Sequence, residues 1–146
     1  MCNTIYLSTT SNQDLSALSG SFFQIAQPTT EELEFAREYL RYPHVWSLLG
    51  PHGDCSCHFR HLMVESSSLG FGGREDWFGE DDDDVNATQA VYDTFKILVD
   101  SGEKIDLIDG WNHEMTDDWE SIDVSLAEVT RDTFRFFEDF RFELTV

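Results

Sequence analysis

Basic residues are scarce in this chain of 146 residues. Nine lysines and arginines stand against 29 aspartates and glutamates, so the formal net charge at pH 7 is −20. Binding to nucleic acid neutralises phosphates with Lys and Arg, and anionic membrane surfaces attract the same residues. The composition therefore argues against direct binding to nucleic acid or membranes and favours a cationic protein partner. A saline environment would produce the same bias, so the charge alone identifies neither a function nor an oligomeric state.

Long apolar runs and a secretory leader are also missing. No apolar run reaches the roughly 18–20 residues that span a bilayer. The first residues, MCNTIYLSTT, contain no basic segment followed by an apolar one, so we expect no secretory signal. The three cysteines, an odd number, fit reduced thiols, and we therefore expect a cytoplasmic protein.

Catalytic and nucleotide-binding motifs are absent from the sequence. It contains no serine elbow, no P-loop and no dinucleotide fingerprint. The stretch GFGGRED (70–76) has the glycines of a phosphate loop, but Glu75 and Asp76 would repel a phosphate. Asp106, Asp109 and Glu114 would serve acid–base chemistry only if the fold gathers them. Whether the chain is an enzyme stays open, and a non-enzymatic role is favoured.

The order of sequence patterns is typical of an α+β protein. Alternating or apolar runs predict strands at 3–9, 22–27, 44–50, 55–64 and 104–111, and a closing hairpin with arms 134–137 and 140–146. Thr29 and Glu32 form a capping-box pattern that predicts a first helix. Asn86 and Gln89 predict a second helix, which we expect to end at Ser101 and Gly102.

We therefore predict a single α+β domain over residues 1–146. It has an antiparallel or mixed sheet of about six to eight short strands, with two helices packed against a face of it. A more barrel-like sheet is the alternative. Residues 65–84, rich in Gly and Ser and then acidic, are expected to form a mobile loop. Apolar helix residues should contact apolar strand residues, namely Leu33, Ala36, Leu40, Val91, Phe95 and Leu98 against Ile5, Leu7, Ile105, Leu107, Phe140 and Phe142.

One compact group of metal-ligand residue types occurs in GPHGDCSCHFRHL (50–62). A structural zinc site there would use Cys55, Cys57 and His61, with Cys2, His52 or His58 as the fourth ligand. On a regular strand, however, the two cysteines share a face with Phe59, and reduced cysteines are commonly buried. We favour this second interpretation, in which the thiols line the core. Thiol redox chemistry is the third, although redox dithiols usually have two residues between the cysteines.

Three features also resemble small uncharacterised bacterial proteins. They are the cysteine pair after a glycine-bearing turn, the strand ending in Gly110-Trp111 and the closing hairpin. The resemblance covers the second half of the chain. It implies one domain and a cytoplasmic setting, and it implies no activity.

Three hypotheses for function follow from these observations. The first, which we favour, is a binding or regulatory module for a cationic protein partner; in one version the carboxylates imitate the phosphates of DNA. The second is a structural zinc-binding protein, and the third is a small enzyme of unknown class.

Overall fold

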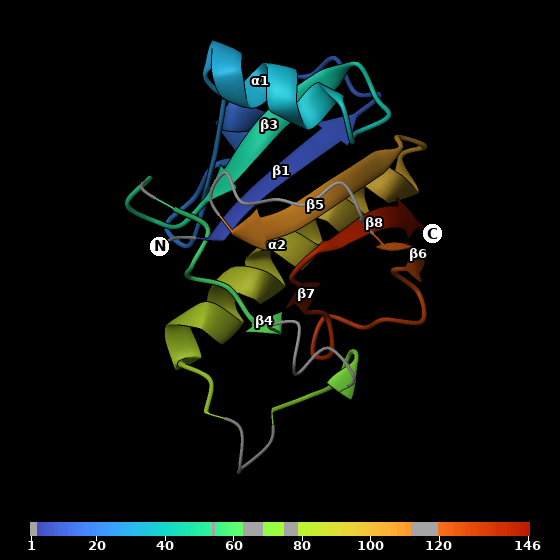
Figure 1. Ribbon diagram of the computed structural model, residues 1–146. Helices are drawn as coiled ribbons and strands as arrows, with labels where there is room; N and C mark the ends of the chain where they lie inside the picture. The colour runs from blue at the N-terminus through green and yellow to red at the C-terminus, as the bar shows by residue number, and fades with distance from the viewer. Residues whose placement is uncertain (1–2, 54, 63–68, 75–78, 112–119) are drawn as a thin grey trace.

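The computed structural model describes residues 3–53, 55–62, 69–74, 79–111 and 120–146 (Figure 1). Its main feature is a six-stranded sheet in the order β2-β3-β1-β5-β8-β6. All neighbouring strands are antiparallel except β6 and β8, which are parallel. The predicted α+β fold with a mixed sheet is therefore confirmed. The strands are β1 (Asn3–Thr9), β2 (Gln24–Ala26), β3 (His44–Leu49), β5 (Ile105–Trp111), β6 (Glu120–Ser125) and β8 (Phe140–Thr145).

The larger part of the core lies between the sheet and α2 (Asp82–Asp100), which Figure 1 shows passing behind β5 and β8. Alternate strand residues face this side, since side chains on a strand point to opposite faces in turn. Val91, Phe95 and Leu98 of α2 share one core cluster with Ile5 and Leu7 of β1. The cluster also contains Ile105, Leu107 and Phe142, as the sequence predicted for this helix.

The first helix, α1 (Thr30–Arg37), covers the opposite face of the sheet. Ala36 and the following Leu40 share a second, smaller cluster with Tyr6 and Val45, and this cluster also includes Ile108. The prediction that Leu33, Ala36 and Leu40 pack against the same strand face as α2 is wrong. Hydrophobic periodicity shows that a helix has an apolar side, but it does not show which face of a sheet the helix covers.

The start of α1 is the capping box that the sequence predicted. The Thr29 hydroxyl accepts a hydrogen bond from the Glu32 N–H at 3.3 Å, and Glu32 Oε1 accepts one from the Thr29 N–H at 2.9 Å. The other oxygen of Glu32 accepts a hydrogen bond from the Tyr6 hydroxyl at 2.8 Å. Glu32 therefore both caps α1 and ties it to the central strand β1.

The second helix begins one turn earlier than the sequence predicted. It starts at Asp82, with Asp81 at the cap position, whereas the capping pattern placed its start at Asn86. The expected loop at 65–84 is correspondingly shorter, because its last three residues are helical. The end is as predicted: Gly102 has φ +96°, and the Glu103 N–H donates to the Leu98 carbonyl at 3.1 Å. Within the described residues, no helix is both long and apolar enough to cross a membrane.

Two strand predictions, the strand at 55–64 and the closing hairpin, differ from the structure. Residues 55–60 form a loop, and among the described residues of 55–64 only His61–Leu62 is a strand, β4; it pairs in parallel with β7 (Phe136–Phe137) in a separate two-stranded sheet. The closing hairpin is not a paired ladder, because β7 lies in this small sheet while β8 pairs with β5 and β6. A turn at Glu138 and Asp139 joins the two strands, and Asp139 has φ +64°.

A buried polar network completes the α1 side of the sheet. Arg141 of β8 donates through Nη2 to Asp106 Oδ2 of β5 at 2.6 Å, and the Ser8 hydroxyl of β1 donates to the other oxygen. Next to it, Tyr42 donates to Glu143, and burial together with the Glu143 carboxylate raises the pKa of Tyr42 to about 12. The network therefore pairs the buried charged groups on this face of the sheet.

Candidate functional site

The loop after β3 carries the cysteines and histidines that the sequence singles out. It opens with a turn in which the Gly53 N–H donates to the Gly50 carbonyl at 3.0 Å. Gly53 has φ +71°, a conformation that glycine adopts without steric cost. The chain then returns, because the Gly50 N–H donates to the Cys55 carbonyl at 2.7 Å. The predicted turn after β3 is thus confirmed.

Ser56 ties this loop to the sheet. It is fully buried, its hydroxyl accepts a hydrogen bond from the Ile5 N–H at 2.9 Å, and it donates one to the Leu48 carbonyl. Cys57 is exposed and Cys55 is only half-buried. The favoured prediction that both thiols line the core is therefore wrong. It assumed strand alternation through 55–60, whereas the hydrogen bonds of Ser56 fix a loop in which the serine faces inward.

His61 is held between two acceptors. Its Nε2 lies 2.6 Å from the carbonyl oxygen of Ser56, and its Nδ1 lies 2.7 Å from Asp109 Oδ2. A carbonyl oxygen can only accept, so Nε2 donates to it, and the carboxylate takes a hydrogen bond from Nδ1. With both nitrogens engaged in this way, His61 has no lone pair to offer a metal ion.

The charge of Asp109 favours the protonated form of this histidine. Burial alone would lower the pKa of His61, but the charge and hydrogen bond of Asp109 outweigh burial, and the pKa is raised. Asp109 is fully buried, and its second oxygen, Oδ1, receives no hydrogen bond from any described residue. The pair therefore connects β4 to β5 as a buried ion pair.

The predicted zinc ligands are not gathered by the described part of the chain. No group of three or more His, Cys, Asp or Glu side chains placed to hold a metal occurs there. His52 is exposed and lines a surface pocket, whereas His61 is committed to Asp109. Cys2 lies outside the described residues. The zinc site consequently stays a prediction, and the geometry of His61 gives it no support.

A surface pocket of about 380 Å³ lies between this loop and the start of α2. His52 and His58 come from the loop, and Asp83 and Asp84 come from the first turn of the helix. Phe22, which precedes β2 and is 43% exposed, also lines it. We call this the histidine pocket; its remaining lining residues are Ser21, Pro51 and Ala87.

Negative charge dominates the histidine pocket. Among the described residues that line it there is no lysine or arginine. The pKa of Asp84 is raised, first by burial and then by the neighbouring Asp81, although His58 and His61 act in the opposite direction. Burial is the larger cause of this shift, and the charges of the neighbouring aspartates add to it.

Two arginines do not compensate the negative charge of the histidine pocket, because they are buried in ion pairs of their own. The sequence did not reveal these pairs. Arg60 and Arg135 both pair with Glu80, whose Oε1 lies 3.0 Å from Arg60 Nη2 and 3.2 Å from Arg135 Nη2. Burial would raise the pKa of Glu80, but hydrogen bonds and charges of the two arginines outweigh burial and lower it. The glycine-rich stretch surrounds the same arginines: the carbonyls of Gly70, Gly72 and Gly73 accept hydrogen bonds from them.

Most exposed cations are also paired with acids. Lys96 Nζ lies 3.2 Å from Asp100 Oδ2, and Arg131 Nε lies 3.0 Å from Asp93 Oδ1. Arg74 Nη1 lies 2.5 Å from Asp82 Oδ1. Arg41 lies 3.7 Å from Glu143. The cations of the chain are thus largely neutralised by their own neighbours, while the acids of the histidine pocket are not.

The carboxylates considered for acid–base chemistry are separated by the fold. Asp106 faces the α1 side of the sheet and pairs with Arg141, whereas Asp109 pairs with His61 beside the small sheet. Glu114 lies outside the described residues. Both described aspartates are fully buried, so neither presents a carboxylate to a substrate.

Comparison of the chain with protein-family models, with curated proteins and with solved structures found no match. The resemblance to small uncharacterised bacterial proteins therefore stays a prediction. Any functional conclusion has to rest on the geometry of the molecule itself.

Proposed function

We propose that this protein is a non-enzymatic binding or regulatory module, which receives a basic side chain of a cationic protein partner in the histidine pocket. One observation supports the proposal above others. Asp83 and Asp84 line a pocket whose described lining includes no lysine or arginine, next to the exposed ring of Phe22.

The chemistry of the pocket suits a guanidinium or ammonium group. Carboxylates accept charge-assisted hydrogen bonds from both, and an aromatic face attracts a cation that stacks on it. The raised pKa of Asp84 adds to this argument, because an incoming cation would stabilise the ionised form of that carboxyl. Binding should therefore favour arginine or lysine over neutral side chains of similar size.

The surface charge bears on what the module binds, and the cysteine content bears on where it acts. Direct binding to nucleic acid is disfavoured because phosphates would meet unneutralised carboxylates. We place the module in the cytoplasm, as its cysteine content predicts.

Titration calorimetry with an acetylated peptide carrying two arginines tests the proposal. A peptide of the same sequence with citrulline in place of arginine keeps the size and removes the charge. We expect the arginine peptide to bind and the citrulline peptide to bind at least about tenfold more weakly, the effect of losing roughly 1.4 kcal/mol. Affinity should fall as salt rises from 0.1 M towards 1 M, because the screening length shrinks from about 10 Å to about 3 Å.

Paired variants locate the binding site. Asp83→Asn with Asp84→Asn should weaken binding of the arginine peptide about tenfold or more, since a hydrogen bond to a charged group contributes about 1.5–3 kcal/mol. Asp123→Asn with Glu128→Gln removes the same charge from exposed positions in and after the edge strand β6 and should change it little. An equal loss of affinity for the arginine peptide in both double variants would show that net charge alone attracts the peptide. It would refute binding in the histidine pocket.

A further inference from the structure

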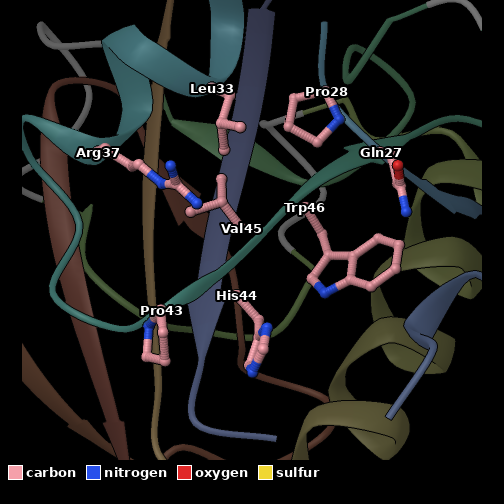
Figure 2. Close-up of a pocket in the computed structure, with 8 residues that line it drawn as sticks. All are labelled: Gln27, Pro28, Leu33, Arg37, Pro43, His44, Val45 and Trp46. Atoms are coloured by element: carbon pink, nitrogen blue, oxygen red, sulfur yellow. The ribbon is translucent and has the colours of Figure 1, made fainter. Parts of the chain in front are cut away.

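A second pocket, of about 210 Å³, lies at the other end of β3, between that strand and α1 (Figure 2). Leu33 and Arg37, one turn apart on α1, project towards Val45 on β3. Gln27 and Pro28 close the opposite side, where the chain leaves β2. None of these residues belongs to the histidine pocket, so the two sites are independent.

The pocket exists because β2 is too short to cover β3. Its last residue, Ala26, pairs with Ser47, so His44, Val45 and Trp46 have no described strand beside them on that edge. Pro28 follows two residues later, and proline cannot donate to a strand ladder. The sheet edge is therefore open at the place where α1 passes over it.

The polar groups of this pocket are unusual for so acidic a chain. None of the described residues that line it is an aspartate or a glutamate. Arg37 is exposed and forms no ion pair with any described residue, unlike most other cations of the chain. Trp46 is 7% exposed, and its Nε1–H is buried without an acceptor among the described residues. Figure 2 shows the nitrogen-bearing edge of its ring on the side of His44.

The exposed guanidinium and the apolar lining point to an acceptor with an apolar body. Arg37 can only donate hydrogen bonds. Trp46 belongs to the core cluster on the α2 face, so its indole is a reporter beside the pocket and is not a ligand contact. Pro28, Leu33, Pro43 and Val45 supply apolar contact surface. With one permanent cation in the pocket and a net charge of −20 on the chain, a single negative charge is favoured over a polyanion.

We propose that this pocket binds a small apolar monocarboxylate. Its carboxylate pairs with Arg37, and its apolar body lies against Leu33 and Val45. A cavity of about 150 Å³ is enough to hold benzene, so an acid of the size of benzoate fits. The carboxylate belongs either to a free organic acid or to the C-terminus of a peptide that ends in an apolar residue.

Benzoate is a suitable probe, with benzamide as its neutral counterpart of nearly equal shape. In ¹H–¹⁵N spectra of the full chain, the four tryptophans give separate indole signals, and a Trp46→Phe variant assigns the one that matters. We expect benzoate to shift the Trp46 indole signal saturably and benzamide to leave it unchanged. Arg37→Gln should raise the Kd for benzoate about tenfold.

Arg41→Gln is the matched control, because Arg41 is also an exposed arginine but does not line the pocket. It should leave the Kd within about twofold. No saturable shift with millimolar benzoate, or an equal shift with benzamide, would overturn the proposal, and both tests use the unmodified protein. A peptide ending in a free leucine carboxylate that binds more tightly than benzoate would identify a chain terminus as the source; the reverse order would identify a free acid.

Discussion

At the scale of single residues, buried charges dominate the behaviour of this molecule. Glu80 joins Arg60 and Arg135, which lie 20 and 55 positions away along the chain. All three side chains are almost fully buried, with exposures of 5%, 2% and 3%. Removing the Glu80 carboxylate would take from both buried guanidinium groups the acid that they share.

Glu80→Gln should therefore lower the free energy of unfolding by about 3–5 kcal/mol, the usual effect of breaking a buried ion pair. Asp93→Asn removes a carboxylate from an exposed pair with Arg131 and should change it by less than about 1 kcal/mol. Urea denaturation of both variants measures the difference. Similar small losses in the two variants would show that Glu80 is not the counter-charge of the buried arginines.

The His61–Asp109 pair makes stability depend on pH. The folded-state pKa of His61 lies above its ordinary value of 6.5, so the folded protein keeps this proton longer as the pH rises. The contribution of the pair is complete below that value and is lost as the pH rises through the folded-state pKa. NMR titration of the His61 ring should give a midpoint above 6.5, and Asp109→Asn should lower it. A midpoint below 6.5 in the unmodified protein would contradict the ion pair.

Residue types alone could not have predicted these pairs. The sequence marked Cys55, Cys57 and His61 as chemically unusual, and His61 does occupy a special position. Its partner Asp109 is 48 residues away, and 29 acids offer many candidates. The serine between the cysteines carried no signal, although Ser56 fixes the loop.

At the scale of elements, local signals succeeded where the physics is local. Alternation identified β1 and β5, and the capping box at Thr29 and Glu32 located the start of α1. The prediction of strand partners failed. The stretch FRFFEDFRF (134–142) has phenylalanines at both odd and even positions, so its pattern does not encode which strand lies beside it. In the structure Phe136 pairs with His61, while Phe142 pairs with Leu107.

The start of α2 offers a test of one misjudged signal. If the helix begins at Asp82, Asn86 lies inside it, where alanine is preferred to asparagine by up to about 0.7 kcal/mol. Asn86→Ala should therefore leave stability unchanged or raise it slightly. Thr29→Ala, at the confirmed cap of α1, should lower it by about 1 kcal/mol. Urea denaturation measures both, and a loss of about 1 kcal/mol in Asn86→Ala would place the cap at Asn86 after all.

At the scale of the whole molecule, the distribution of charge matters more than its sum. Arg60, Arg135 and Arg141 are buried in ion pairs, and most exposed cations lie beside acids. The described surface therefore presents carboxylates that have no ion pair with a described lysine or arginine, and at the histidine pocket two of them lie near an exposed aromatic ring. The net charge was evident from composition, but the two pockets depend on the path of the chain after β2 and β3.

The central claim, that the histidine pocket receives a basic side chain, is tested most directly by mapping the arginine peptide on the protein with ¹H–¹⁵N spectra. The account predicts saturable shifts concentrated at Phe22, His52, His58, Asp83 and Asp84, with β6 unaffected, and no such shifts with the citrulline peptide. Shifts spread over exposed acids throughout the molecule, or centred away from these residues, would contradict it.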